Sequence, residues 1–326
     1  MFKQTLGAVA LAMAFSGWVS AEEVKIGFLV KQAEEPWFQT EWAFAEKAGK
    51  EHGFTVIKIA VPDGEKTLSA IDSLAANGAK GFVICPPDVS LGPAIVAKAK
   101  VNGLKVMAVD DRFVDAKGNF MEEVPYLGMA AFEVGQKQGA AMAAEAKKRG
   151  WDWKDTYAVI NTFNELDTGK KRTDGSIKSL EEAGIPKDHI LTAALKTLDV
   201  PGSMDATNSA LVKLPSGAKN LIIGGMNDNT VLGGVRATES AGFKAANVIG
   251  IGINGTDAIG ELKKADSGFF GSMLPSPHIE GYNTALAMYE WVTTGKEPAK
   301  YTAMDEVTLI TRANFQEELT KIGLWK

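Results

Sequence analysis

Short, nearly continuous apolar runs alternate with helical segments along this chain, and no other feature restricts its fold as strongly. The first runs are VKIGFLV (24–30), FTVIKIAV (54–61), GFVIC (81–85) and LKVMAV (104–109). Between the first two, Phe38, Trp42 and Ala45 fall on one helical face. Strands that are apolar throughout and separated by helices are typical of a parallel sheet covered on both faces. The pattern therefore predicts a doubly wound α/β unit.

The same alternation restarts in the second half of the chain. A helix is predicted from Phe132 to Arg149, and a second one runs to about Ala183 with Asp167 as its cap. Further helices are predicted at about 202–213, 229–241 and 256–265. Strands are predicted at TYAVIN (156–161), HILTAA (189–194), NLIIGG (220–225), NVIGIGI (247–253) and FFGSML (269–274). A length of 326 residues also suits two domains better than one core. We therefore expect a second doubly wound lobe.

Two further elements follow that second set. Residues Pro277 to Thr294 have the pattern of a helix, and VTLI (307–310) has that of a strand. A single linker between the lobes would leave both elements in the second lobe. The residues alone do not show whether the chain crosses back to the first lobe.

The first residues have the pattern of a secretory signal peptide. Lys3 provides the positive charge, Leu6 to Phe15 form an apolar stretch too short to span a bilayer, and Val19-Ser20-Ala21 places small residues around a cleavage site. Cleavage after Ala21 is predicted, which implies that the protein is exported. No later segment has the length and apolarity of a transmembrane helix.

Charge and cysteine content limit the partners. Asp and Glu number 40 against 35 Lys and Arg, so there is no basic excess to bind nucleic acid. Cys85 is the single cysteine, which rules out an internal disulfide, and its place in an apolar run favours a small buried side chain over a reactive thiol.

Polar and aromatic side chains gather just after the predicted strands. Ligands of parallel α/β sheets bind beyond the carboxyl ends of the strands. The residues found there include Lys31, Glu35, Trp37, Phe38, Asp110, Asp111, Arg172, Met226, Asn227 and Asn254. Carboxylates accept hydrogen bonds, cations and amides donate them, and aromatic rings pack on C–H faces. This mixture of both charges suits a neutral sugar.

Each of these residues also has a plainer interpretation. Trp37 and Phe38 on a first helical turn are more often core residues. The Asp110-Asp111 pair is also compatible with capping of the next turn, and Asn227 and Asn254 with helix N-caps. The sugar-site hypothesis depends on their joint position at strand ends.

Other kinds of site are weakly supported. Residues 250–255 read G-x-G-x-x-G, the dinucleotide fingerprint, but no strand ending in an acid follows about 20 residues later. His52, His189 and His278 lack the spacing of metal ligands, and no G-x-S-x-G elbow is present. A glycosidase needs a carboxyl pair. Glu35 and Asp111 could form one, but nothing in their sequence context favours a raised pKa. We therefore expect no metal, no cofactor and no catalytic group.

Long collinear stretches resemble the bacterial periplasmic L-arabinose-binding proteins, within the periplasmic sugar-binding family of ABC importers. They are LVKQAEEPWFQTEW (29–42), VIKIAVPDGEKTL (56–68), AVDDRFV (108–114), NELDTGKKRT (164–173), GGMNDNTVLGGVRATE (224–239), IGIGINGTDA (249–258), SMLPSP (272–277) and VTLITRANF (307–315). The resemblance implies a type I periplasmic binding protein: two doubly wound parallel-sheet lobes joined by a three-segment hinge. It places residues 22–130 and 276–305 in lobe one, and 131–275 and 306–326 in lobe two.

The resemblance also implies a function. It implies a monomer that closes on L-arabinose, with D-galactose and D-fucose as further ligands, and delivers the sugar to the membrane permease of an ABC importer. The implied sugar contacts are Lys31, Glu35, Asp110, Asp111, Arg172, Asn227 and Asn254, with Trp37 and Phe38 as the aromatic pair and Met129, Met226 and Cys85 close by. Gly128 stands where a relative carries Met, and Gly169-Lys170-Lys171 replaces a more Arg-rich stretch, so the order of sugar preference stays open.

Three other function classes share this fold. A sugar-responsive transcription regulator needs an N-terminal helix-turn-helix, and a signal-peptide pattern occupies that place. A sugar-active enzyme and a sensor that docks on a chemoreceptor are the other two. Turnover of a glycoside would support the enzyme, whereas docking on a receptor is compatible with sugar binding.

Overall fold

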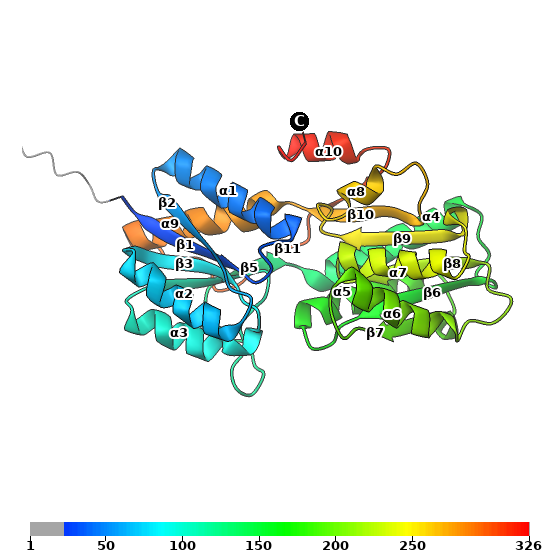
Figure 1. The fold of residues 1–326 in the computed structure, drawn as a ribbon, viewed down its shortest axis with the longest axis horizontal. Helices are drawn as coiled ribbons and strands as arrows, with labels where there is room; N and C mark the ends of the chain where they lie inside the picture. Colours follow the sequence, from blue (N-terminus) through cyan, green and yellow to red (C-terminus); the bar gives the residue numbers. More distant parts are fainter. Residues whose placement is uncertain (1–22, 326) are drawn as a thin grey trace, which may run out of the picture.

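The computed structural model describes residues 23–325. They form two lobes, each built on a six-stranded sheet (Figure 1). The predicted signal peptide and its cleavage after Ala21 lie outside the described residues. The predicted architecture of two doubly wound lobes is confirmed. Within the described residues, no helix is both long and apolar enough to cross a membrane.

Lobe one has a fully parallel sheet in the order β11-β5-β4-β3-β1-β2. Its strands are β1 (Lys25–Val30), β2 (Thr55–Ala60), β3 (Ala79–Cys85), β4 (Lys105–Val109), β5 (Tyr126–Met129) and β11 (Thr302–Met304). One face is covered by α2 (Gly64–Ala76) and α3 (Gly92–Val101), preceded by the short turn η1 (Val89–Leu91). The other face is covered by α1 (Pro36–His52), the π-helix η4 (Ile279–Asn283) and α9 (Thr284–Thr294).

Lobe two repeats this plan with the strand order β12-β10-β9-β8-β6-β7. Its strands are β6 (Thr156–Thr162), β7 (Ile190–Ala194), β8 (Asn220–Gly225), β9 (Val248–Ile253), β10 (Phe269–Pro275) and β12 (Val307–Thr311). Only β12 is antiparallel to its neighbour. Its helices and short turns are α4 (Ala131–Lys148), α5 (Asp167–Glu182), η2 (Lys187–His189), α6 (Val200–Leu211), α7 (Asp228–Ser240), η3 (Ala245–Asn247), α8 (Ile259–Leu262) and α10 (Phe315–Lys321). A hydrophobic cluster lies on each side of the sheet.

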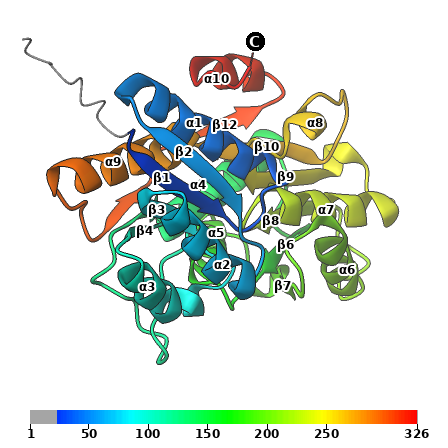
Figure 2. The same ribbon diagram turned by 60° about the vertical axis from the view of Figure 1, so that its left-hand side comes forward.

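The chain passes between the two sheets at three places, between β5 and α4, between β10 and η4, and between β11 and β12. As a result α1 and α9, which are far apart in sequence, pack side by side on lobe one (Figures 1 and 2). An ion pair of 2.9 Å joins Lys137 Nζ of α4 to Asp305 Oδ2 at the last passage. The question that the residues left open is thus answered: the chain does cross back.

Several predicted elements differ in detail. The helix predicted at 277–294 is a π-helical turn followed by α9, and that predicted at 256–265 shrinks to α8. Leu166, not Asp167, precedes α5 as its cap. Gly250 and Gly252 lie inside β9, so most of the apparent dinucleotide fingerprint is a buried strand rather than a phosphate-binding turn.

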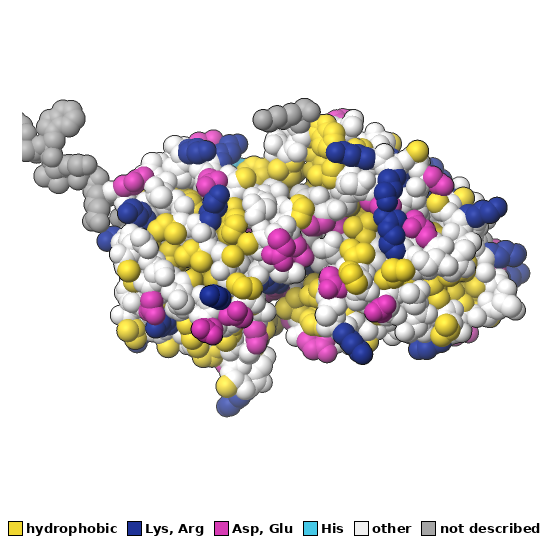
Figure 3. All heavy atoms as spheres, in the orientation of Figure 1, with side chains coloured by type: hydrophobic (Ala, Val, Ile, Leu, Met, Phe, Trp, Pro, Cys, Tyr) yellow, Lys and Arg dark blue, Asp and Glu magenta, His cyan; other side chains and the backbone are white. Residues whose placement is uncertain are grey.

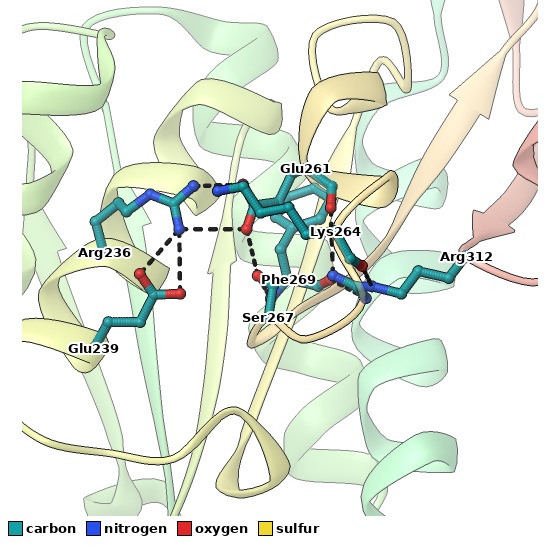
Figure 4. A network of polar contacts seen from close by, with 7 residues as sticks. All are labelled: Arg236, Glu239, Glu261, Lys264, Ser267, Phe269 and Arg312. Carbon is teal, nitrogen blue, oxygen red and sulfur yellow. Dashed lines mark hydrogen bonds and ion pairs between the residues drawn. The ribbon is translucent and has the colours of Figure 1, made fainter.

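A buried carboxylate organises the outer part of lobe two (Figure 4). Glu261 forms ion pairs with Arg236 and with Lys264 Nζ, the latter at 2.7 Å, and accepts a hydrogen bond from Ser267. Nearby, Arg312, which follows β12, donates to the carbonyls of Lys264 and Phe269 at 2.8 and 2.7 Å. These contacts fasten the returning C-terminal strand to the segment between α8 and β10.

Glu261→Gln should destabilise the protein in a pH-dependent way. Burial alone would raise the pKa of Glu261, but hydrogen bonds from Arg236, Lys264 and Ser267 outweigh it and lower the pKa to about 2. A lowered pKa stabilises the fold above the unfolded value of 4.5, and this contribution is lost as pH falls towards 2. Thermal unfolding at pH 7 should show a melting temperature lower by roughly 2–4 °C, with the difference shrinking in acid.

Glu239→Gln is the matched control, because Glu239 binds the same Arg236 from a more exposed position. Equal and small effects of both substitutions at pH 7 would contradict the central role of Glu261.

Candidate functional site

Two cavities open at the junction of the lobes, and residues of both lobes line each of them. They share Val89, Asp111 and Leu166. One extends along Arg112, Tyr126, Met129 and Thr168, and the other along Lys31, Gln32, Phe163 and Glu165. Figure 3 shows this junction as an indentation with acidic side chains along it. The segments that follow β1, β4 and β6 therefore border one cleft, and Asp111 lies at its centre.

The strongest interactions of the cleft are made by the Asp110-Asp111 pair after β4. Asp111 is 1% exposed, forms an ion pair with Lys31, and accepts a hydrogen bond of 2.7 Å from Thr168 Oγ1 of the opposite lobe. Burial alone would raise the pKa of Asp111, but Lys31, with Thr168 and Arg172, outweighs it and lowers that pKa. Burial and Asp111 raise the pKa of Asp110. The two neighbouring carboxyls thus differ in how firmly each holds its charge.

Arg172 reaches this pair from α5 of lobe two. Its Nη2 lies 3.3 Å from Asp110 Oδ1, and its Nη1 donates to the carbonyl of Met226 at 3.0 Å. The side chain is 5% exposed. Close packing of α4 on α5 fixes its position, because a Cβ on Gly135 would lie 1.9 Å from the carbonyl oxygen of Arg172. The guanidinium is therefore held at the junction by backbone packing.

Glu35 makes a second contact across the cleft. Its Oε1 accepts from Gln32 Nε2 at 3.0 Å and from Asn229 Nδ2 of lobe two at 3.3 Å. Burial and the charge of Asp257 raise the pKa of Glu35 to about 7. This carboxyl can therefore donate as well as accept near neutral pH.

The two predicted amides have different structural roles. Asn227 is the N-cap of α7, where its side chain accepts from the Thr230 amide at 3.0 Å. Asn254 is no helix cap: its φ is +112°, and within residues 23–325 only Asp110, at +60°, is another non-glycine residue with positive φ. Asp228 supports this turn by accepting from the Gly255 amide at 2.8 Å. Strained backbone of this kind concentrates at functional sites.

The apolar members of the predicted site are buried. Trp37 and Phe38 belong to the core cluster of lobe one together with Cys85, and Met129 lines the cleft beside Asp111. Met226 is buried at the end of β8 and its carbonyl holds Arg172.

Cys85 Sγ lies 3.8 Å from a carboxylate oxygen of both Asp110 and Asp111, close enough for the three to share a metal ion. Burial raises the pKa of Cys85, which keeps it a neutral thiol, and Lys31 already neutralises Asp111. The chemistry of these groups therefore disfavours a cation.

Comparison with known proteins identifies the family. Residues 23–318 match the family described as periplasmic binding proteins and sugar binding domain of LacI family. The chain belongs to this family. It is 58% identical over 324 residues to the L-arabinose-binding periplasmic protein of Escherichia coli strain K12, covering 99% of this chain and 98% of that protein. It is 43% identical over 303 residues to the ABC transporter L-arabinose-binding periplasmic protein of Azospirillum brasilense, covering 92% and 90%.

A solved structure shows the same fold at low sequence identity. It is an ABC transporter periplasmic solute-binding protein of Actinobacillus succinogenes with bound D-allose. The match has a TM-score of 0.73 at 18% identity and covers 90% of this chain and 100% of that one. The predicted resemblance and the type I periplasmic binding protein fold are confirmed.

Sequence reasoning missed some residues of this family member's cleft. Thr168 was given no role, and Asn229 and Tyr126 were not singled out. Asn229 lies only two residues beyond Asn227, so the strand-end rule extended by one helical turn would have found it. Tyr126 had no local signal.

A buried carboxyl pair near Asp110 was also missed. Glu41 of α1 and Glu280 of η4 are 0% and 2% exposed, and three of their four oxygens lack a hydrogen-bond partner among the described residues. Burial and Glu280 raise the pKa of Glu41 well above its usual range, and burial and Asp110 raise that of Glu280 to about 8. The pair therefore keeps at least one proton at neutral pH.

Glu280→Gln should remove a loss of stability at high pH. Folding raises the pKa of this carboxyl from 4.5 to about 8. Its contribution to the free energy of unfolding is therefore complete below pH 4.5 and is lost as the pH rises through 8. The slope is at most about 1.4 kcal/mol per pH unit. Denaturant unfolding from pH 5 to 9 should show a flatter profile for the variant, with Glu290→Gln on the exposed part of α9 as control. Parallel profiles for the variant and the wild type would refute this assignment.

Proposed function

We propose that this chain is a periplasmic binding protein that captures a monosaccharide, L-arabinose first, between its lobes. The observation that carries this proposal is the meeting of buried charges of both signs at the cleft. Lys31 faces Asp111 within lobe one, and Arg172 of lobe two faces Asp110 across the cleft. A neutral ligand with many hydroxyls can accept from the cations and donate to the carboxylates at once.

The choice of sugar rests on the relatives. The relatives from Escherichia coli and Azospirillum brasilense are both named for L-arabinose, and each match covers more than nine tenths of this chain. We extend the proposal to D-galactose and D-fucose as weaker ligands, with Trp37 as stacking ring and Asn227 and Asn254 as donors from lobe two.

Capture works through closure of the two lobes. The sugar stabilises the closed state because only there do groups from both lobes contact it. A wrong epimer would leave buried polar groups without partners, which costs affinity and gives selectivity. On this proposal the loaded monomer then passes the sugar to the membrane permease of an ABC importer, and no reaction takes place.

Arg172→Ala and Asn254→Ala should each weaken L-arabinose binding at least tenfold. Each removes a buried donor from lobe two, which leaves a sugar hydroxyl or Asp110 without its partner. Calorimetric titration gives the dissociation constants. Lys178→Ala, on the exposed face of the same helix as Arg172, is the matched control and should bind as the wild type does. Titration curves for both site variants that equal that of the wild type would refute the site.

The series of sugars tests selectivity. Titration of the wild type with L-arabinose, D-galactose, D-fucose and D-ribose should give the tightest binding for L-arabinose, with a Trp37 emission change. The reverse order, or no heat with any of the four, would contradict the proposed ligand.

One observation favours a second candidate function. Glu35, with a pKa near 7, and ionised Asp111 have the two protonation states that a glycosidase needs. Release of the aryl group from an aryl arabinoside by the wild type, lost in Glu35→Gln, would support an enzyme instead of a binding protein.

A further inference from the structure

The main chain at Asp110 forms a strained three-residue turn. The Asp111 amide donates to the carbonyl of Val109 at 2.6 Å, and Asp110 between them has a φ of +60°. A three-residue turn with a positive central φ is the rare form of the γ-turn, and it persists only when surrounding groups hold it. This turn directs the Asp110 and Asp111 side chains to Arg172 and Thr168 of the opposite lobe.

Tyr126 is the side chain that holds this turn. Its hydroxyl donates to the carbonyl of Asp110 at 2.8 Å, and the side chain is 3% exposed in the wall of the cleft next to Asp111. Burial and the charges of Asp110 and Asp111 raise the pKa of Tyr126, so the hydroxyl keeps its proton and remains a donor. Tyr301, close to the last passage between the lobes, stacks on the Tyr126 ring, with the two ring centroids 5.6 Å apart.

Gly128 leaves the space that this arrangement needs. Tyr126 and Gly128 are two residues apart in β5 and thus point to the same face of the sheet. A Cβ on Gly128 would lie 2.0 Å from the Tyr126 hydroxyl and 2.5 Å from the ring carbon that carries it. The hydroxyl can therefore reach Asp110 only because residue 128 has no side chain.

We propose that Tyr126 is a positioning residue of the ligand site, which holds the γ-turn at 109–111 and so aims Asp110 and Asp111, and that Gly128 is required for it to do so. This inference rests on the proposed sugar site for its effect on binding. Its effect on the turn is independent of any ligand.

The test uses Tyr126→Phe, which removes one hydroxyl and keeps the ring. Amide hydrogen exchange of Asp111 in the sugar-free protein should become about tenfold faster, because the turn opens more often. L-Arabinose binding, measured by calorimetry well below the melting temperature, should weaken about fivefold. A purely structural tyrosine would change the melting temperature and leave both readouts alone. Tyr289→Phe, in α9 of the same lobe, is the matched control.

Gly128→Ala completes a double-mutant cycle. Alone it should weaken binding as much as Tyr126→Phe or more, because it pushes the hydroxyl away from Asp110. The double variant should lose much less affinity than the product of the two single fold-losses, because Tyr126→Phe has already removed the hydrogen bond. If the alanine variant does not fold, Tyr126→Phe still decides.

Unchanged amide exchange at Asp111 together with wild-type affinity in Tyr126→Phe would overturn the inference. So would a double variant whose loss of affinity equals the product of the two single fold-losses. A wild-type protein that binds no sugar would instead contradict the proposed function, and the exchange measurement would still decide the role of Tyr126.

Discussion

Buried charges of both signs meet where the two lobes touch, and the rest of the site depends on how they are balanced. Lobe one supplies Lys31 and the Asp110-Asp111 carboxyls, whereas Arg172 and Thr168 come from lobe two. Buried charges are tolerated only when each has a partner of opposite sign or good hydrogen bonds. The Arg172–Asp110 ion pair crosses the cleft, so bringing the lobes together also gives Asp110 its partner of opposite sign.

This balance limits which molecules the cleft can accept. An anion would compete with Asp110 and Asp111 for the cations, and a metal ion would have to displace Lys31 from Asp111. A neutral molecule bearing hydroxyls disturbs neither pairing, because each hydroxyl donates on one side and accepts on the other. Charge balance within the site thus selects a neutral ligand more sharply than the overall excess of acidic residues does.

The alternation of apolar runs and helical segments was enough to predict both sheets, because strands buried on two faces must be apolar along their whole length. Two strands escaped this reasoning. The strands β5 and β11 have four and three residues, and they pair with each other although they are far apart in the sequence. Strands this short depend on pairing with other strands, and among the described residues β11 pairs only with the distant β5, so no local pattern predicts them. The same is true of the last passage between the lobes, which follows β11 directly.

The strand-end rule identified the charged residues that meet in the cleft, because the carboxyl ends of parallel strands lie at one edge of a sheet. Lys31 follows β1, whereas Asp110 and Asp111 follow β4, with β3 between these two strands of one sheet. Lys31 pairs directly with Asp111. The groups that hold them in place obey no such rule. Tyr126 lies inside a strand and acts through a main-chain carbonyl, and Gly128 acts through the absence of a side chain. A polar side chain at a strand end can be identified from the sequence. A residue that orients another residue can be identified only from its contacts in the structure.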